Sequence, residues 1–258
     1  MRTIHCHNLK HLGDCIETLH FLINATNTND VRFNFYCNPI YHNQLSELIV
    51  HHTSVIELTK TIQKSSIETW VAGYGDYGQI NDQCIDDMGY PDQSKGFLIH
   101  WIRISEIMNI VCPFTNKSDL IHNQSILSEP CELTTKYDYL FINSLCLSLI
   151  YDNFEQEGLT ILNTLKRLGK TVITTRKILD FPCTLDYNLS VVKIGQLSKN
   201  VKTIIAANTG PIHLCMNVWT LSNIEKFIIW TPSHSHNFNF GPKFRTVTSL
   251  SELKESEL

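Results

Sequence analysis

Strand-like and helix-like stretches alternate along this 258-residue chain, and this alternation constrains the fold more than any other feature of the sequence. Short apolar runs and strict apolar–polar alternation are typical of strands, whereas apolar residues three or four positions apart are typical of helices. Strands that alternate with helices form βαβ units around a parallel sheet. The sequence therefore predicts an α/β protein.

The pattern predicts individual elements. Strands are expected at residues 3–7, 31–36, 55–58, 68–72, 139–143, 171–175, 189–193, 203–207 and 226–230. Helices are expected from about residue 14, at 41–50, 97–110 and 153–168, and from Pro211, with a helical turn at 195–200 and a helical tail at 251–258. Residues 73–96 read as a long loop and residues 113–136 as a polar crossing. We therefore expect two α/β domains, an N-terminal one at residues 1–130 and a C-terminal one at residues 131–258.

Composition excludes several classes of protein. The hydrophobic content of 43% is enough for a core, and the net charge of −4 argues against a general nucleic-acid binder. The start of the chain lacks the apolar core of a signal peptide, and no apolar run is long enough for a transmembrane helix. The nine cysteines are odd in number and irregularly spaced. We therefore expect reduced thiols in the cytoplasm, with peripheral membrane contact left open.

The sequence N-T-G-P-I-H at residues 208–213 stands between a predicted strand and a predicted helix. The first N–H groups of a helix have no partner within it, and the helix dipole adds partial positive charge there. Pro211 suits the first helical position, Gly210 lets a ligand approach the backbone, and Thr209 and His213 supply side-chain donors. The turn therefore predicts a phosphate or diphosphate site, with an ordinary strand–turn–helix corner as the alternative.

A second loop, from Lys10 to Asp14, follows the first predicted strand. Ligands of open parallel sheets bind outside the carboxyl ends of the strands. Both loops stand at such ends, so we expect the two domains to face a central cleft.

These two motifs resemble those of the heptosyltransferase family, which are glycosyltransferases of the GT-B fold that use ADP-heptose. The first motif reads H-L-G-D-C-I-E-T-L-H at residues 11–20, and the second is the turn at 208–213. Their order and separation suit two small Rossmann-like domains. The loop at Asn143 and Ser144 also stands where such enzymes begin their nucleotide-binding domain.

The resemblance implies a transfer that inverts the anomeric centre, needs no metal and no cofactor, and moves sugar from a nucleotide sugar to a glycan or glycolipid. It implies that Asp14 is the general base and that Thr209, Gly210 and His213 hold the diphosphate, with Asn208 and Pro211 in the same turn. An Asp at a helix start is also a common N-cap, so both interpretations of Asp14 stay open. Further candidates for substrate binding are Lys10, His11, Gly13, Asn143, Ser144, Arg176 and Lys177, with Lys243 a weaker candidate for the basic residue.

The sequence departs from the family pattern at two positions. Asn208 stands where the family usually has Asp, and His20 stands where it usually has Pro. These departures leave two other functions open: a non-catalytic protein that binds a nucleotide sugar, and a nucleotide-sugar epimerase of similar fold.

Other polar groupings have simpler interpretations. His5 and His7 share one face of a strand while Cys6 points away, so with His11 they form an incomplete metal site. His234 and His236 are expected in a solvated loop or, alternatively, at the cleft. The acidic residues at 76, 82, 86 and 87 are expected to be solvated, with sugar binding as the alternative, and Trp70 and Trp101 are expected in the core.

Overall fold

The computed structural model describes residues 1–69, 92–144, 149–233 and 238–258, and the strands within these ranges form two parallel sheets. The first sheet has the order β3-β2-β1-β4, and the second has the order β6-β5-β7-β8-β9. The strands are β1 Arg2–Asn8, β2 Val31–Cys37, β3 Ile56–Thr59, β4 Ile67–Glu68, β5 Tyr137–Ile142, β6 Val172–Thr174, β7 Val201–Ala207, β8 Lys226–Trp230 and β9 Phe244–Val247.

Helices follow most of these strands, as right-handed crossovers between parallel strands require. The α-helices are α1 Leu12–Thr28, α2 His42–Leu48, α3 Gln93–Met108, α4 Phe154–Arg167, α5 Val191–Ser198, α6 Gly210–Cys215 and α7 Val218–Asn223. Short 3-10 turns are η1 Pro39–Tyr41, η4 Lys117–Leu120, η5 Ser125–Ser128, η6 Thr184–Tyr187, η8 Leu250–Glu252 and η9 Glu255–Glu257. The predicted α/β class with parallel sheets is confirmed.

The predicted strand at 189–193 is wrong, because these residues enter helix α5. The adjacent valines, Val191 and Val192, favour a strand by propensity alone. Ser190 decides otherwise, since its hydroxyl accepts a hydrogen bond from the N–H of Lys193 (3.2 Å) and caps the helix. The tail forms two 3-10 turns instead of an α-helix, and β9 is an additional strand that the pattern did not predict.

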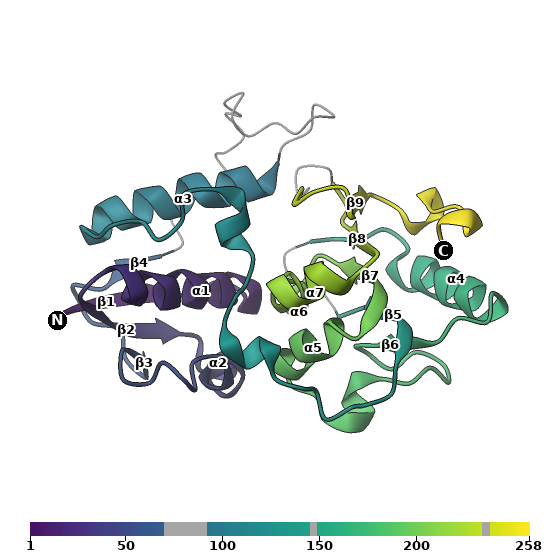
Figure 1. The fold of residues 1–258 in the computed structure, drawn as a ribbon, viewed down its shortest axis with the longest axis horizontal. Coiled ribbons are helices and arrows are strands. Elements are labelled where there is room, and N and C mark those ends of the chain that lie inside the picture. Colours follow the sequence, from purple (N-terminus) through teal and green to yellow (C-terminus); the bar gives the residue numbers. More distant parts are fainter. Residues whose placement is uncertain (70–91, 145–148, 234–237) are drawn as a thin grey trace.

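The two sheets lie on either side of a shared core (Figure 1). Helix α1 meets α6 near the centre of the molecule, and one continuous cluster of buried apolar residues runs from Ile4 to Phe238 through both halves. A second cluster surrounds Trp230 and packs α4 against the C-terminal sheet. Trp101 is fully buried and stacks on Phe21 at 4.6 Å, which confirms its place in the core. Trp70 lies outside the described residues.

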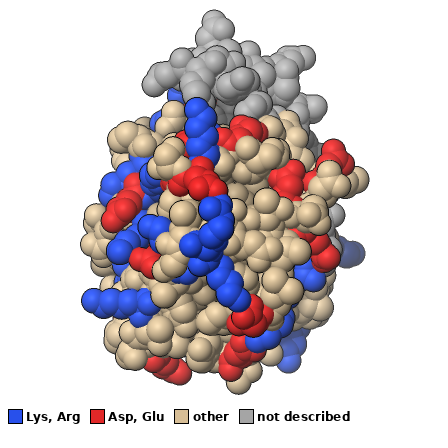
Figure 2. Space-filling view, turned by 90° about the vertical axis from the view of Figure 1, so that its right-hand side faces the viewer, with Lys and Arg blue, Asp and Glu red and all other residues tan. Residues whose placement is uncertain are grey.

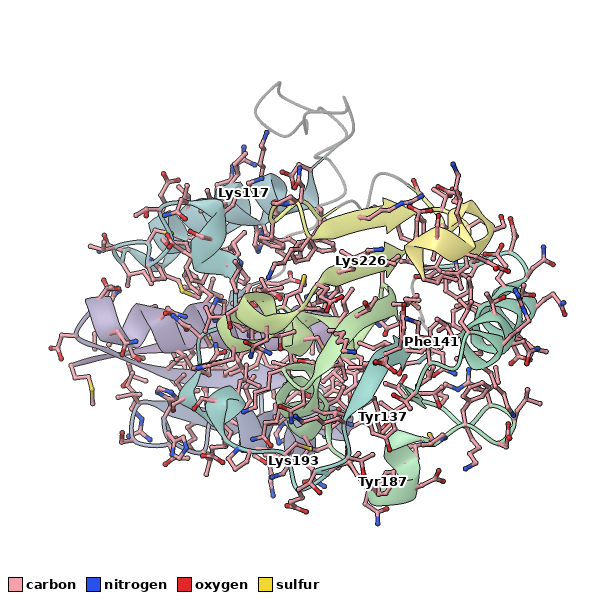
Figure 3. All side chains as sticks on the ribbon, turned by 45° about the vertical axis from the view of Figure 1, so that its right-hand side comes forward. Lys117, Tyr137, Phe141, Tyr187, Lys193 and Lys226 are labelled. Carbon is pink, nitrogen blue, oxygen red and sulfur yellow. The ribbon has the colours of Figure 1, made fainter. Side chains whose placement is uncertain are left out.

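Residues 109–136 connect the two halves and contact both of them. The N–H of His122 donates to the carbonyl of Met216 (2.9 Å). Lys117, near the junction of the halves in Figure 3, donates to the buried carboxylate of Asp92 and to the carbonyl of Asn239, each at 2.9 Å. This connection therefore ties the start of α3 to the C-terminal half.

Acidic and basic side chains are interspersed on the face of the C-terminal half that Figure 2 shows. Exposed ion pairs of the C-terminal half include Lys166–Asp180 (2.8 Å) and Lys202–Asp138 (2.9 Å). This face does not present the continuous basic field that a nucleic-acid binder needs.

Candidate functional site

The two sequence motifs come into direct contact. Gly13 lies in the first turn of α1 after β1, and His213 lies in α6 after β7. A Cβ atom on Gly13 would lie 2.8 Å from both Cδ2 and Nε2 of His213, and a Cβ atom on Gly210 would lie 3.2 Å from the Leu12 side chain. The segments that follow β1 and β7, one strand from each sheet, therefore meet at one place.

Asp14 closes the first turn of α1. The N-cap residue is His11 and not Asp14; Asp14 is the third residue of the helix, and one oxygen of its carboxylate accepts a hydrogen bond from the N–H of His11 (3.0 Å), as in a capping box. Burial raises the pKa of Asp14 above its usual value, although the charge of His213 and the bond from His11 oppose this. A carboxylate with a raised pKa is a better proton acceptor, so capping and general-base roles are compatible at this position.

Glu17 lies one turn further along α1 and is buried between the two halves. Its Oε1 lies 2.7 Å from Nδ1 of His213 and 3.1 Å from Nε2 of His122. Burial would raise the pKa of Glu17, but the charges and hydrogen bonds of His122 and His213 outweigh burial and hold the pKa well below its usual value. Glu17 is therefore a carboxylate that accepts from both imidazoles.

A chain of hydrogen bonds fixes the protons behind Glu17. The carbonyl of Asp119 can only accept, so Nε2 of His20 donates to it (3.0 Å) and Nδ1 of His20 accepts from Nε2 of Gln124 (2.5 Å). Oε1 of Gln124 then accepts from Nδ1 of His122 (3.2 Å). Nε2 of His122 lies 3.1 Å from Oε1 of Glu17, so His122 joins Gln124 to the buried carboxylate. The unexpected His20 is thus a buried neutral member of this network, stacked on His122 at 4.2 Å.

The predicted diphosphate turn has the expected local structure. Thr209 is the N-cap residue of α6, and Pro211 stands in its first turn. The Thr209 hydroxyl is buried and has no hydrogen-bond partner among the described residues. The N–H of Asn208 donates to the carbonyl of Trp230 (3.0 Å) and to the hydroxyl of Tyr151 (2.8 Å). Because α6 has only six residues, its dipole contributes little, and the site depends on side chains.

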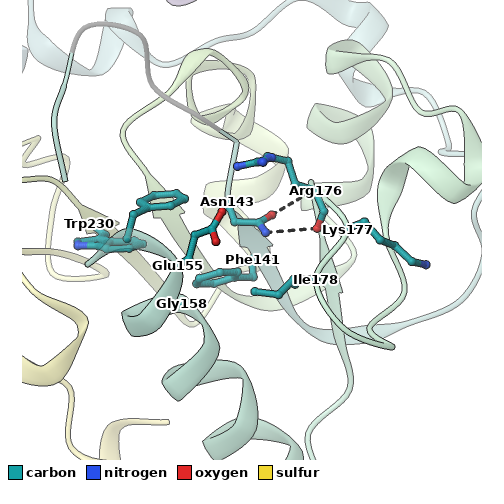
Figure 4. A pocket seen from close by; sticks show the side chains of 9 residues that line it. Phe141, Asn143, Glu155, Gly158, Arg176, Lys177, Ile178 and Trp230 are labelled. Atoms are coloured by element: carbon teal, nitrogen blue, oxygen red, sulfur yellow. Dashed lines mark hydrogen bonds between the residues drawn. The ribbon is translucent and has the colours of Figure 1, made fainter. Parts of the chain in front are cut away.

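A pocket of about 110 Å³ lies beside this turn, at the carboxyl ends of β5, β6 and β8. Its lining consists of aromatic and polar side chains: Phe141, Asn143, Phe154, Glu155, Gly158, Arg176, Lys177, Ile178 and Trp230. Figure 4 shows Asn143 in the middle of the pocket, with Trp230 at one end and Lys177 at the other. This volume is smaller than the several hundred Å³ of a typical ligand site.

Asn143 organises the polar side of the pocket. Its Oδ1 accepts from the N–H groups of Thr175 (3.1 Å) and Arg176 (2.8 Å), and its Nδ2 donates to the carbonyl of Arg176 (3.2 Å). Ser144 hydrogen-bonds to the Thr175 hydroxyl at 3.0 Å. Within the described residues the Arg176 guanidinium has no ion-pair partner, whereas Lys177 pairs with Asp186 at 2.8 Å. Arg176 is therefore the better of the two predicted cations for binding an anion.

The remaining predicted residues lie apart from the pocket. Lys10 and His11 are exposed in the loop between β1 and α1, and the ammonium of Lys243 donates to the carbonyl of Leu221 (2.8 Å). His234, His236 and the acidic residues at 76–87 lie outside the described residues. His7 hydrogen-bonds to Ser66 at 3.0 Å, and no group of three metal-ligating side chains occurs in the part of the chain that the structure describes.

Sequence reasoning missed Glu17, His122, Gln124 and Tyr151. A signal for Glu17 was present, since Asp14, Glu17 and His20 recur every three residues along a helix whose other residues are largely apolar. Such spacing places the three side chains along one side of the helix. His122 and Gln124 stand in a polar connection, where no periodic pattern distinguishes a buried residue from a solvated one.

None of the helices within the described ranges is long and apolar enough to cross a membrane. No family model matches the chain, and no curated protein matches it. Solved structures do match, at low sequence identity, over nearly the whole chain.

Escherichia coli heptosyltransferase WaaC with ADP-2-deoxy-2-fluoro heptose gives a TM-score of 0.56 at 11% identity, covering 100% of this chain and 97% of WaaC. A glycosyl transferase family 9 protein from Veillonella parvula gives 0.52 at 12% identity, covering 99% of this chain and 94% of that protein. The iron-containing dodecameric glycosyltransferase TibC from enterotoxigenic E. coli gives a TM-score of 0.55 at 14% identity. The match covers 95% of this chain but only 62% of the length of TibC. The chain therefore has the GT-B-like fold of heptosyltransferases, as the motifs predicted.

Proposed function

We propose that this protein is a glycosyltransferase that moves a sugar from a nucleotide-sugar donor to a carbohydrate or glycoconjugate acceptor. The observation that carries the proposal is the direct contact between the Gly13–Asp14 turn and the Thr209–His213 turn within a heptosyltransferase-like fold. That contact brings a carboxylate from one half within reach of a cluster of hydrogen-bond donors from the other. WaaC is solved with ADP, and a nucleoside diphosphate is the leaving group that this transfer needs.

In the proposed reaction, an acceptor hydroxyl attacks the anomeric carbon from the face opposite the diphosphate, so the configuration inverts. Asp14 takes the hydroxyl proton as the new carbon–oxygen bond forms. The bond from the anomeric carbon to the diphosphate breaks, and the electron pair leaves on the nucleoside diphosphate. Thr209, His213 and Arg176 stabilise that charge as hydrogen-bond donors and cations, so the proposal requires no metal and no cofactor.

The donor is proposed to lie along the C-terminal half, with its diphosphate at Thr209–His213 and another part of the nucleotide in the pocket around Asn143. The unpartnered Thr209 hydroxyl and the unpaired Arg176 support this orientation, because each is a donor without an acceptor among the described residues. The proposal includes a cytoplasmic location, which the free thiols of the described cysteines support.

A binding screen tests the donor site. Thermal unfolding is measured with ADP, UDP, GDP, CDP and dTDP, and one of them is expected to raise the Tm. A ligand at about 100 times its Kd stabilises a protein by about 2.7 kcal/mol. His213→Ala is expected to remove most of this shift, whereas Lys243→Ala is expected to keep it. If none of the five raises the Tm, the donor site is refuted.

Asp14→Asn separates the two roles of Asp14. The amide oxygen of Asn still accepts from the N–H of His11, so the helix cap and the Tm are retained. The amide cannot take a proton, so release of nucleoside diphosphate from the matching nucleotide sugar is expected to fall by about two orders of magnitude or more. Unchanged turnover would assign Asp14 to capping alone, and binding without turnover in the unmodified protein would favour a non-catalytic nucleotide-sugar binder.

A further inference from the structure

The carboxylate of Glu17 lies behind His213, on the side of the ring away from Gly13. Nδ1 of His213 lies 2.7 Å from Oε1 of Glu17. The opposite edge of the ring, Cδ2 and Nε2, faces Gly13, as the close approach of a Gly13 Cβ to both atoms shows. Nε2 has no hydrogen-bond partner within the described residues, and the side chain keeps 11% of its surface exposed.

We propose that Glu17 is a positioning residue for the donor diphosphate: it fixes the ring orientation and the protons of His213 so that Nε2–H is presented to the diphosphate. This inference rests on the proposed function. Glu17 touches neither the sugar nor the diphosphate in this arrangement and acts only through His213.

The proton assignment follows from what a carboxylate can do. An ionised carboxylate only accepts, so Nδ1 of His213 carries the proton of this bond. A neutral ring with a proton on Nδ1 would present a lone pair at Nε2 and repel a phosphate oxygen. With Nδ1 held by Glu17, the proposed bound ring donates from both nitrogens, one to Glu17 and one to a phosphate oxygen. Glu17 therefore fixes the orientation of the ring and the proton on Nδ1.

The position of Glu17 explains why this bond holds the ring firmly. Glu17 is 5% exposed, and its carboxylate is held from the other side by His122 at 3.1 Å. His122 is in turn held by Gln124. A charge-assisted hydrogen bond contributes about 1.5–3 kcal/mol, which corresponds to a factor of about ten or more in affinity.

The first test measures binding of ADP and of inorganic pyrophosphate by calorimetry. Pyrophosphate carries the diphosphate without a base, so it reports on this part of the site alone. Glu17→Gln is expected to lower the affinity for both ligands by about tenfold. This is the lower end of the range expected when one hydrogen bond loses its charge. His51→Gln is the control, because His51 is half exposed and pairs with Glu129 away from this network, and it is expected to leave both affinities within about threefold.

A double-mutant cycle separates positioning from general structural damage. If Glu17 acts through His213, adding Glu17→Gln to His213→Ala causes no further loss of ADP affinity. A further loss of about tenfold in the double variant would overturn the positioning role.

The third measurement needs no variant. Nitrogen-15 NMR of the imidazole groups in the full-length protein is expected to show Nδ1 of His213 protonated before ligand is added, and both nitrogens protonated with pyrophosphate bound. A ring protonated only at Nε2 before ligand is added would overturn the inference even if Glu17→Gln fails to fold.

Equal ADP affinity in Glu17→Gln and the unmodified protein would also overturn the positioning role of Glu17, while leaving the proposed function standing. Failure of the unmodified protein to bind any nucleoside diphosphate would instead refute the proposed function, and the positioning role with it.

Discussion

The α-carbon of Gly13 faces the imidazole ring of His213 across the junction of the two halves. The space between them admits no side chain, because a Cβ atom on Gly13 would come within 2.8 Å of two ring atoms. The ring cannot withdraw easily, since Glu17 holds its far side. Positive φ angles occur at Gly169 and Gly241 among the described glycines, so the need for glycine at position 13 comes from this contact and not from the backbone.

Gly13→Ala is therefore expected to destabilise the protein by about 1–3 kcal/mol, the usual cost of overpacking. Urea unfolding followed by circular dichroism measures this loss. Gly158→Ala is the matched control, because its Cβ would meet the Phe141 ring at an ordinary 3.5 Å within α4. Alanine favours a helix over glycine by about 1 kcal/mol, so the control is expected to keep or gain stability. A Gly13→Ala protein as stable as the control would show that the ring moves freely.

At this scale the sequence placed both motif loops at strand ends, but it did not predict that Gly13 contacts His213 or what holds that ring. Gly13, Asp14, Gly210 and His213 could be identified because they stand at strand ends, where ligands bind. Glu17 could not be assigned a partner, because one sequence does not tell which buried side chains from distant segments face one another. His20 departs from the family pattern, and only the fold explains it, through the amide of Gln124 and the carbonyl of Asp119.

Helix α1 is buried along most of its length between the first sheet, the connection at 109–136 and helix α6. Its polar side chains therefore need partners from those elements. His20 finds them in the connection, and burial lowers its pKa from 6.5 to about 3, with the charge of His122 acting in the same direction. Helix α3 offers a second case, since burial lowers the pKa of His100 to about 4.

These two histidines are expected to make the protein less stable in acid. Below about pH 6.5 these two histidines bind protons in the unfolded chain but stay neutral in the folded protein. Their contribution to the free energy of unfolding is therefore fully present above that pH and is lost as the pH falls toward 3 or 4. Each histidine contributes a slope of about 1.4 kcal/mol per pH unit over this range. Urea unfolding at a series of pH values from about 7.5 to 4.5 measures the slope.

His20→Gln tests the assignment, because glutamine retains a donor and an acceptor but does not titrate in this range. The dependence of the free energy of unfolding on pH is expected to fall by about 1.4 kcal/mol per pH unit, which corresponds to the uptake of one proton fewer on unfolding. His51→Gln is the control, since His51 is half exposed and pairs only with an exposed glutamate. An equal slope in His20→Gln and the unmodified protein would assign the acid sensitivity to other groups.

Elements with a strong periodic pattern were predictable, as were the short strands β3 and β6, whereas the start of α5 and strand β9 were not. The central strands β1, β2, β5 and β7 are buried runs with clear boundaries, and α4 has a distinct apolar face. The start of α5 was misassigned because a single capping serine outweighed two β-branched residues. Strand β9 has four residues and forms only by pairing with β8, which local pattern cannot reveal.

At the scale of the whole molecule, the two halves are joined by a common apolar core and by buried polar contacts. The larger apolar cluster is continuous through both of them. Polar ties add to it, since Glu17 of the first half holds His213 of the second, and Lys117 bridges Asp92 and Asn239. Opening one half would expose apolar surface, separate the buried carboxylate of Glu17 from His213, and separate Lys117 from the carbonyl of Asn239. Removing one partner of a buried ion pair costs about 3–5 kcal/mol.

We therefore expect the chain to unfold in one cooperative transition, although the sequence predicted two domains. The four tryptophans divide evenly, with Trp70 and Trp101 in the first half of the sequence and Trp219 and Trp230 in the second. In urea, the fluorescence midpoints of the double variants Trp70→Phe/Trp101→Phe and Trp219→Phe/Trp230→Phe are each expected to coincide with the circular dichroism midpoint of the same variant. If the halves were independent, the fluorescence of each variant would follow the half that keeps its tryptophans, and circular dichroism would show two steps. Separated midpoints would mean that the shared core and the buried ion pairs are too weak to couple the two sheets.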